Sequence, residues 1–211
     1  MIRVLIADDH PIYRQGLLQI LMEVPDMFAV DEAGSGEEAL SKALDKNYDL
    51  VLLDISMPGR GGLDALKALK THLPKLPVLI LSMHPEEQYA VRALRAGASG
   101  YLNKECAWDE LVIAIKKVLG GGKYVSAALA EKLADNLGSG NTDRPLQEIL
   151  SNREYQVFRM IASGKTVSAI AEELSLSIKT ISTHRVRILG KMKLKNNAEL
   201  IHYAITNKLA D

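Results

Sequence analysis

Short apolar segments in the first half of the chain lead directly into reactive polar side chains. The segments span 3–7, 50–53, 78–81 and 100–102, and the polar residues after them are Asp8 with Asp9, Asp54, Ser82 and Lys104. Apolar runs of this length are typical of strands buried on both faces of a parallel sheet. The carboxyl ends of such strands share one edge of the sheet, where α/β proteins bind ligands. We therefore expect carboxylates, a hydroxyl and an ammonium group to converge on one site.

Helical patterns alternate with these strands. The helices are predicted at 10–21, 37–44, 63–73, 86–96 and 108–119, and one further strand is predicted at 28–33. Five strand–helix units within about 120 residues indicate an α/β domain. We predict a flavodoxin-like, doubly wound, five-stranded parallel sheet with the strand order 2-1-3-4-5.

The pattern changes after residue 122. A stretch at 127–137 can form a helix, and the small polar residues of 138–145 indicate a linker. A capping box at Ser151 and Glu154 opens a helix that runs to about residue 163, and further helices are predicted at 167–174, 178–192 and 197–207. Two short helices joined by a tight turn, the second of them basic, indicate a small all-α helix-turn-helix domain. The expected division is therefore 1–122, a linker at 123–146, and 147–211.

Charge is spread unequally over these parts, although the whole chain has 26 basic and 26 acidic residues. Residues 1–122 hold 13 Lys and Arg against 17 Asp and Glu, whereas residues 123–211 hold 13 against 9. The segment 176–195 has six basic residues and no acidic one. An acidic domain joined to a locally basic one indicates two tasks, the second of which involves a polyanion.

Three features of the chain bear on its compartment. No stretch approaches the roughly 18 consecutive apolar residues of a membrane helix, and the start of the chain has no signal-peptide pattern. The single cysteine, Cys106, excludes an internal disulfide and is typical of a reducing compartment. We expect a cytoplasmic protein without a membrane partner.

The polar residues at the predicted sheet edge suit a hard cation and a phosphoryl group. Mg²⁺ prefers oxygen ligands and usually takes one or two carboxylates, which Asp8 or Asp9 can supply together with Asp54. A carboxylate can also attack phosphorus to form an aspartyl phosphate, and Asp54 is the candidate because it stands alone after the central strand. Ser82 can donate a hydrogen bond to a phosphoryl oxygen, and Lys104 can place a positive charge on another. A single Asp at a strand end is often only a helix cap, but the whole set favours a site.

The basic helix at 178–192 has a recognisable buried face. Ile181, His184, Ile188 and Leu189 recur at helical spacing and are predicted to face the core, with His184 packed rather than reading a base. The candidate DNA-binding residues are Lys179, Thr180, Ser182, Thr183, Val186, Arg187 and Lys191.

The candidate residues divide by chemistry. Thr183 and Val186 suit contact with a thymine methyl group, and Ser182 can hydrogen-bond a base edge. The basic members suit phosphate contacts. The bland alternative is a solvated basic face, which the lack of any neighbouring acidic residue disfavours.

Motifs in the first domain carry a family resemblance. The motifs are Val-Leu-Ile-Ala-Asp8-Asp9-His10-Pro11, Leu-Leu-Asp54-Ile-Ser-Met-Pro58-Gly59, Leu-Ser82-Met and Gly-Tyr101-Leu-Asn-Lys104. They resemble the receiver domain of bacterial two-component response regulators. One departure is Glu105, which follows the lysine where many receivers have a cis proline.

The receiver resemblance implies a set of roles. It implies phosphorylation of Asp54 by a partner histidine kinase, with Mg²⁺ held by Asp9, Asp54 and the backbone carbonyl of Ser56, assisted by Asp8. It also implies a switch in which Ser82 moves onto the phosphoryl group and Tyr101 reorients inward.

Motifs in the second domain are similar to LuxR-type helix-turn-helix domains. They are Leu150-Ser-Asn-Arg-Glu154, Gly164-Lys-Thr-Val-Ser-Ala-Ile-Ala171-Glu-Glu-Leu174, and 177–184 with 191–194. Together with the receiver they make the chain similar to response regulators of the NarL/FixJ family. That family implies a transcription factor, not an enzyme, which binds double-stranded DNA. It also implies a homodimer when phosphorylated, with contacts from the last helix, 197–207.

Two other classes of function stay open at this point. A phosphatase with an aspartyl-phosphate intermediate would need an acid–base carboxylate two residues after the nucleophile, where Ser56 stands. A protein-interaction module that has lost DNA contact would not need the basic face of the helix at 178–192.

Overall fold

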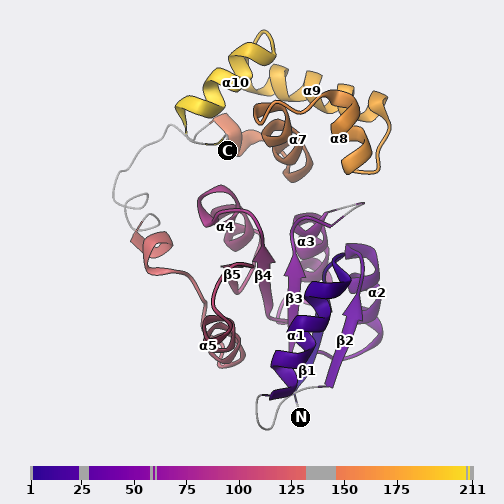
Figure 1. The fold of residues 1–211 in the computed structure, drawn as a ribbon, viewed down its shortest axis with the longest axis vertical. Coiled ribbons are helices and arrows are strands. Elements are labelled where there is room, and N and C mark those ends of the chain that lie inside the picture. The colour runs from indigo at the N-terminus through magenta and orange to yellow at the C-terminus, as the bar shows by residue number, and fades with distance from the viewer. Residues whose placement is uncertain are drawn as a thin grey trace. The chain divides into compact units, whose positions relative to one another are not determined.

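The structure is a computed structural model that describes residues 2–23, 29–57, 59, 61–131, 146–207 and 209. The chain folds as two compact units, Met1–Ser139 and Gly140–Asp211 (Figure 1). The predicted linker at 138–145 and the end of the predicted helix at 127–137 lie outside the described residues. Among the described residues, every helix is too short or too polar to span a bilayer.

The first unit is built on a five-stranded parallel sheet with the order β2-β1-β3-β4-β5, as predicted. The strands are β1 (Arg3–Ala7), β2 (Ala29–Ala33), β3 (Leu50–Asp54), β4 (Val78–Ser82) and β5 (Gly100–Asn103). All residues of β3 and β4 are buried because helices cover both faces of the sheet.

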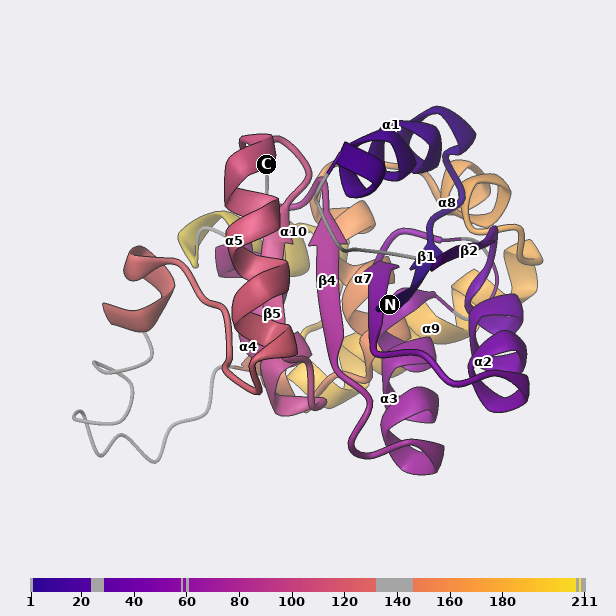
Figure 2. The same ribbon diagram turned by 90° about the horizontal axis from the view of Figure 1, so that it is seen from below.

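Helices form two layers around this sheet. They are α1 (Pro11–Glu23), α2 (Gly36–Asp45), α3 (Gly62–His72), α4 (Glu86–Arg95) and α5 (Trp108–Leu119). Alternate strand residues such as Ile6 and Leu52 pack against Leu17 of α1 and Ile115 of α5. The other three helices cover the opposite face (Figure 2). The predicted strands and helices are confirmed, with ends shifted by a residue or two.

A glycine at the start of α3 lets this helix begin against the end of β3. A Cβ atom added to Gly62 would lie 1.8 Å from the carbonyl oxygen of Asp54, so no side chain fits there. The Gly62 N–H donates to the carbonyl of Ile55 at 3.0 Å. This close approach shapes the loop that carries Asp54 and Ser56.

The second unit is helical throughout. It contains the 3-10 turn η1 (Leu146–Ile149) and the helices α7 (Asn152–Ala162), α8 (Val167–Glu173), α9 (Ile178–Met192) and α10 (Asn197–Thr206). The side chains of Ser151, Thr166, Ser177 and Asn196 cap the four helices in turn, and the predicted capping box of Ser151 with Glu154 is present. The helix-turn-helix of α8 and α9 is confirmed.

Candidate functional site

The polar residues that follow the strands converge at one edge of the sheet, as predicted. Asp8, Asp54 and Ser82 are buried there. The Lys104 ammonium nitrogen lies 2.6 Å from Oδ2 of Asp8 and 2.8 Å from Oδ2 of Asp54, and its side chain is only 3% exposed. The parallel strands bring together groups that are up to 96 positions apart because their carboxyl ends are aligned.

The environment of Asp54 works both for and against its ionised form. Burial raises the pKa of Asp54, the Lys104 ammonium lowers it, and the Asp8 carboxylate raises it again, so that the net pKa is above the usual range. The backbone N–H of Ser56 donates to Oδ1 of Asp54 at 3.0 Å. Both carboxylate oxygens are therefore held in place by neighbouring donors.

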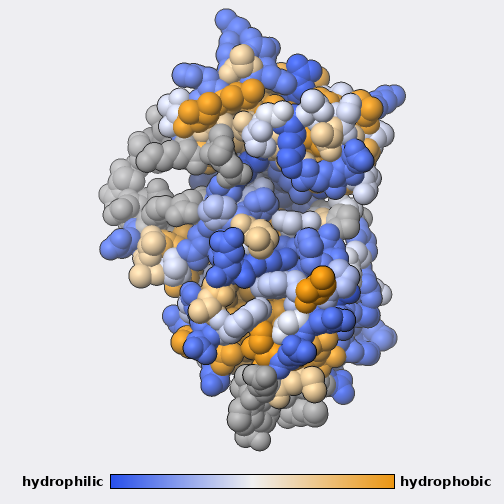
Figure 3. All heavy atoms as spheres, in the orientation of Figure 1, coloured by the Kyte–Doolittle hydropathy of each residue, from blue (hydrophilic) through white to orange (hydrophobic). Residues whose placement is uncertain are grey.

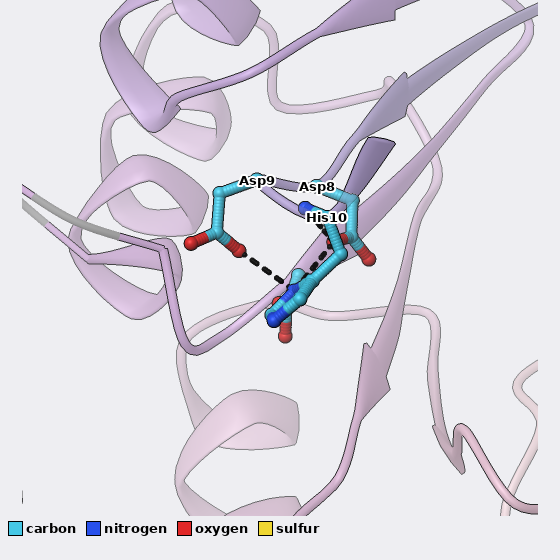
Figure 4. A group of neighbouring side chains, drawn as sticks. Asp8, Asp9 and His10 are labelled. Atoms are coloured by element: carbon cyan, nitrogen blue, oxygen red, sulfur yellow. Dashed lines mark hydrogen bonds and ion pairs between the residues drawn. The ribbon is translucent and has the colours of Figure 1, made fainter. Parts of the chain in front are cut away.

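An imidazole joins the acidic residues. His10 Nδ1 lies 3.2 Å from Oδ1 of Asp8 and 3.0 Å from Oδ1 of Asp9 (Figure 4). Potential ligand atoms of Asp8, Asp9, His10 and Asp54 all lie within 4.8 Å of one another. Among the described residues, no hydrogen-bond donor of good geometry reaches the buried Oδ1 of Asp9. A buried carboxylate oxygen that accepts no hydrogen bond of good geometry, in a cluster with two further carboxylates, fits a divalent cation.

Two side chains of α1 support the site, and the sequence analysis missed both. Arg14 donates through Nη1 to the carbonyl oxygen of Asp8 at 2.6 Å and through Nε to Glu32 at 2.8 Å. The ring of Tyr13 lies with its centroid 4.7 Å from Nζ of Lys104, and burial raises the pKa of its hydroxyl. The available signal was their place in the first turn of a helix that begins at Pro11, directly after the acidic pair.

The two expected switch residues, Ser82 and Tyr101, are connected by the backbone of His84 in the loop after β4. The N–H of His84 donates to Oγ of Ser82 at 3.1 Å. The Tyr101 hydroxyl donates to the carbonyl oxygen of His84 at 2.8 Å, and Tyr101 is fully buried. Tyr101, expected to turn inward during switching, therefore already points inward in this structure.

The basic helix α9 presents a polar face to solvent. Ile181 and Ile188 are fully buried, whereas His184 and Leu189 are half-buried. The exposed candidate DNA-binding residues are Lys179, Thr183, Val186, Arg187 and Lys191, and the half-buried ones are Thr180 and Ser182. All seven candidates are thus accessible.

Two basic side chains of this helix also stabilise the domain itself. Nζ of Lys191 lies 2.6 Å from Oε2 of Glu154 on α7, and Arg185 donates to Asn197 on α10 at 2.7 Å. Burial and the nearby Arg153 guanidinium lower the pKa of His184. Its buried Nδ1 has no hydrogen-bond partner among the described residues, which agrees with a packing position rather than a base contact.

Two family models match the chain, one for each unit. Residues 4–116 match the response regulator receiver domain. Residues 148–204 match the bacterial regulatory proteins of the luxR family. The first match covers the acidic site and the second covers the helix-turn-helix.

Similar proteins match the chain over nearly its whole length. The response regulator GacA of Pseudomonas viridiflava is 36% identical over 211 residues, which is 100% of this chain and 99% of the relative. The response regulator UvrY of Escherichia coli K12 is 36% identical over 212 residues, 100% of this chain and 97% of the relative. The solved structure of RcsB from Salmonella enterica serovar Typhimurium, bound to the promoter rprA with the phosphomimetic BeF3⁻, has a TM-score of 0.65 at 28% identity and covers 96% of this chain and 97% of RcsB.

A receiver domain joined to a LuxR-type helix-turn-helix defines a class of protein in which one domain receives a signal and the other binds DNA. The chain belongs to the NarL/FixJ family of two-component response regulators and is a DNA-binding transcriptional regulator.

Proposed function

We propose that Asp54 accepts a phosphoryl group from a partner histidine kinase and that this modification controls DNA binding by α9. The observation that carries the proposal is the buried Lys104 ammonium, which lies between the buried carboxylates of Asp8 and Asp54. Its positive charge opposes the effect of burial and favours the anionic form of Asp54, which is the nucleophile.

The transfer is a displacement at phosphorus. A bond forms between a carboxylate oxygen of Asp54 and the phosphorus, while the phosphorus–nitrogen bond to the kinase histidine breaks. The electron pair of that bond stays on the imidazole nitrogen, which takes up a proton. The Lys104 ammonium then lies within reach of the new phosphoryl oxygens.

The resemblance and the donor set together support Mg²⁺ as the cofactor. Asp9, Asp54 and the backbone carbonyl of Ser56 would hold it, with Asp8 assisting. When bound, the ion supplies positive charge that offsets the charge on the phosphoryl oxygens.

The modified state would recruit the hydroxyl of Ser82. A phosphorylated side chain carries close to two negative charges and three strong acceptors. To donate to one of them, the Ser82 hydroxyl would turn toward Asp54, which changes the geometry of the bond that it accepts from the His84 N–H. The Tyr101 hydroxyl also bonds His84, so the loop after β4 is the element that would change conformation on phosphorylation.

The output is proposed to be specific binding of double-stranded DNA by a dimer. In this assignment Ser182, Thr183 and Val186 read bases, and Thr180 and the basic candidates position the helix. Lys191 contacts a phosphate only in competition with Glu154.

The α10 helix is the proposed dimer contact. Its Leu200 and Ala204 are buried in the core, whereas Ala198 and Ile205 are exposed. Apolar side chains reach the surface over α10 (Figure 3). Two half-sites one helical turn apart suit such a dimer.

Two further parts of the proposal concern compartment and turnover. Since its partner is chromosomal DNA, the protein is proposed to act in the cytoplasm.

We expect no sustained hydrolysis of small phosphate esters, because Ser56 stands where an acid–base carboxylate would be needed.

Selection of sheared genomic fragments on the purified full chain tests the function. The selection runs with and without beryllofluoride and Mg²⁺, with Asp54→Ala and the isosteric Asp54→Asn as controls. We expect enrichment of a few fragments that share an inverted repeat. The mimic should increase this enrichment in the wild type and not in the two Asp54 variants.

Other outcomes discriminate between the parts of the proposal. Enrichment that is indifferent to the mimic and to Asp54 would retain DNA binding but contradict the phosphorylation switch. No enrichment at physiological salt would move the output to protein partners. Label from a small phosphodonor on Asp54→Ala would contradict the assignment of the acceptor.

A further inference from the structure

The segment that follows α5 docks on the receiver instead of leaving it. Tyr124 forms a parallel bridge with Gly100 of β5. Its N–H donates to the carbonyl of Ser99 at 2.9 Å, and its carbonyl accepts the N–H of Tyr101 at 3.3 Å. Its hydroxyl donates to Glu110 of α5 at 2.8 Å. Tyr124 thus extends the sheet edge beyond β5. We call residues 123–131, expected from sequence to begin the linker, the docked segment.

The amino acid at position 100 is adapted to this docking. A Cβ atom added to Gly100 would lie 2.7 Å from the carbonyl oxygen of Tyr124 and 2.8 Å from a methyl group of Leu79. Both distances are shorter than real Cβ contacts. Only glycine therefore allows β5 to lie against the docked segment without a shift.

A second anchor ties the docked segment to α4. The residues 127–131 are helical, and the Ser126 hydroxyl accepts the N–H of Leu129 at 3.1 Å, as an N-cap does. The same hydroxyl donates to Oε2 of Glu86 in the first turn of α4. Leu129 is 2% exposed. One hydroxyl thus both starts the helix and holds it to α4.

Both anchors adjoin the residues proposed to switch. Glu86 follows Ser82 by four positions, and the intervening His84 bonds Ser82 through its N–H and Tyr101 through its carbonyl. Tyr101 in turn donates its own N–H to Tyr124 of the docked segment. A change in the Ser82 hydroxyl therefore alters the bonding of the loop that leads directly to Glu86.

From this arrangement we infer that the docked segment is the output element of the receiver, moved through Glu86 and Tyr101 when Ser82 turns to a phosphoryl group. The inference rests on the proposed phosphorylation of Asp54. A chain of contacts alone does not demonstrate coupling, which requires an element whose equilibrium responds to both ends. The test therefore perturbs the Ser126–Glu86 anchor and measures both ends.

Matched substitutions at position 126 separate the anchor from the helix cap. Asp, Asn and Ser are about equally good N-caps. Ser126→Asp places a carboxylate against Glu86, whereas Ser126→Asn keeps a donor for it, and Glu86→Gln added to Ser126→Asp restores one. We expect Ser126→Asp to raise the hydrogen-exchange rate of peptide 123–131 about tenfold, as loss of a charged hydrogen bond implies. The Asn variant and the double variant should stay near the wild type.

The second measurement adds beryllofluoride with Mg²⁺ to the full chain. We expect it to change exchange over 123–131 in the wild type and in Ser126→Asn, but not in Ser126→Asp. Phosphorylation by acetyl phosphate, followed by intact mass, should be equal in all three. In the wild type and in Ser126→Asn the mimic should increase the affinity for DNA. In Ser126→Asp the affinities with and without the mimic should be nearly equal.

Each contrary result has a distinct meaning. Equal exchange in Ser126→Asp and Ser126→Asn would overturn the anchor. A wild type that takes the label while exchange over 123–131 stays constant would overturn the coupling and leave the phosphorylation proposal intact. A wild type that takes no label at Asp54 would overturn both.

Discussion

The ammonium nitrogen of Lys191 on α9 lies 2.6 Å from Oε2 of Glu154 on α7. The same carboxylate accepts the backbone N–H of Ser151 at 2.8 Å and so caps its own helix. The side chain of Glu154 is 5% exposed. One buried carboxylate therefore holds the start of α7 and the basic helix α9 together.

The first prediction concerns pH. Burial raises the pKa of Glu154, but the bonds from Lys191 and Ser151 outweigh burial and lower it overall. A lowered pKa gives stability that is present above the unfolded value, about 4.3, and lost as pH falls through the folded value. We expect Glu154→Gln to destabilise α7–α10 by roughly 1 kcal/mol at pH 7. The difference from the wild type should shrink as pH falls below about 4, because the carboxylate becomes protonated and Gln retains the Ser151 bond. Urea unfolding, followed by the NMR resonances of these helices, measures the difference in stability.

The control is Glu172→Gln, at an exposed position of α8. Identical pH profiles for the two variants would contradict the role of Glu154.

The second prediction concerns the turn of the helix-turn-helix. Ser175 has φ of 51°, a left-handed conformation that costs a side chain about 1 kcal/mol. Ser175→Gly removes this strain, but glycine loses more entropy on folding, so we expect a net stabilisation of the domain of roughly 0.5 kcal/mol. Ser163, which follows α7 with φ of −79° and donates its hydroxyl to the carbonyl of Met160 at 3.1 Å, is the control with an ordinary φ. Ser163→Gly should destabilise, and a gain at both positions would show that backbone strain is not the cause.

A third prediction concerns the buried charges of the receiver. Lys104→Met leaves the carboxylates of Asp8 and Asp54 without their shared counter-charge, and we expect a loss of roughly 3 kcal/mol without Mg²⁺. Asp8→Asn in the same chain should recover most of it, because the repulsion is removed. Urea unfolding read through the single tryptophan, Trp108, whose ring centroid lies 6.5 Å from that of Tyr13, measures both. Additive effects of the two substitutions would contradict the shared pairing.

The fourth prediction separates base contacts from phosphate contacts on α9. Thr183→Ala with Val186→Ala should weaken binding to a selected fragment by about 1–3 kcal/mol and leave binding to unrelated DNA nearly unchanged. Arg187→Ala should weaken both about equally and reduce the salt slope by about one. Binding isotherms from 50 to 200 mM salt, roughly the range over which such slopes are resolved, distinguish them. Equal losses for the Thr183 and Val186 variant would mean that another face reads the bases.

Much of this architecture could be predicted because its signals are local. Apolar runs such as 50–53 and 78–81, the capping box at Ser151 and the spacing of Ile181 and Ile188 each reflect the period of one element. The aligned carboxyl ends of parallel strands then place Asp54 and Lys104 together without further information.

Other contacts could not be predicted from such patterns. His10, Tyr13 and Arg14 show no periodic signal of a site, and they join it only because α1 begins against the acidic pair. The pairing of Lys191 with Glu154 spans 37 positions, and its geometry depends on how α9 crosses α7.

Residue patterns along the chain were thus sufficient for the two domains, their secondary structure and the group of residues at the sheet edge, because these depend on periodicity within one element. They were not sufficient for the docked segment. Read alone, its residues indicate only a connector with a helix from 127, and they become part of the receiver through bonds to Ser99, Tyr101 and Glu86. Such partners are far apart along the chain, so only the packed fold places them within hydrogen-bonding distance.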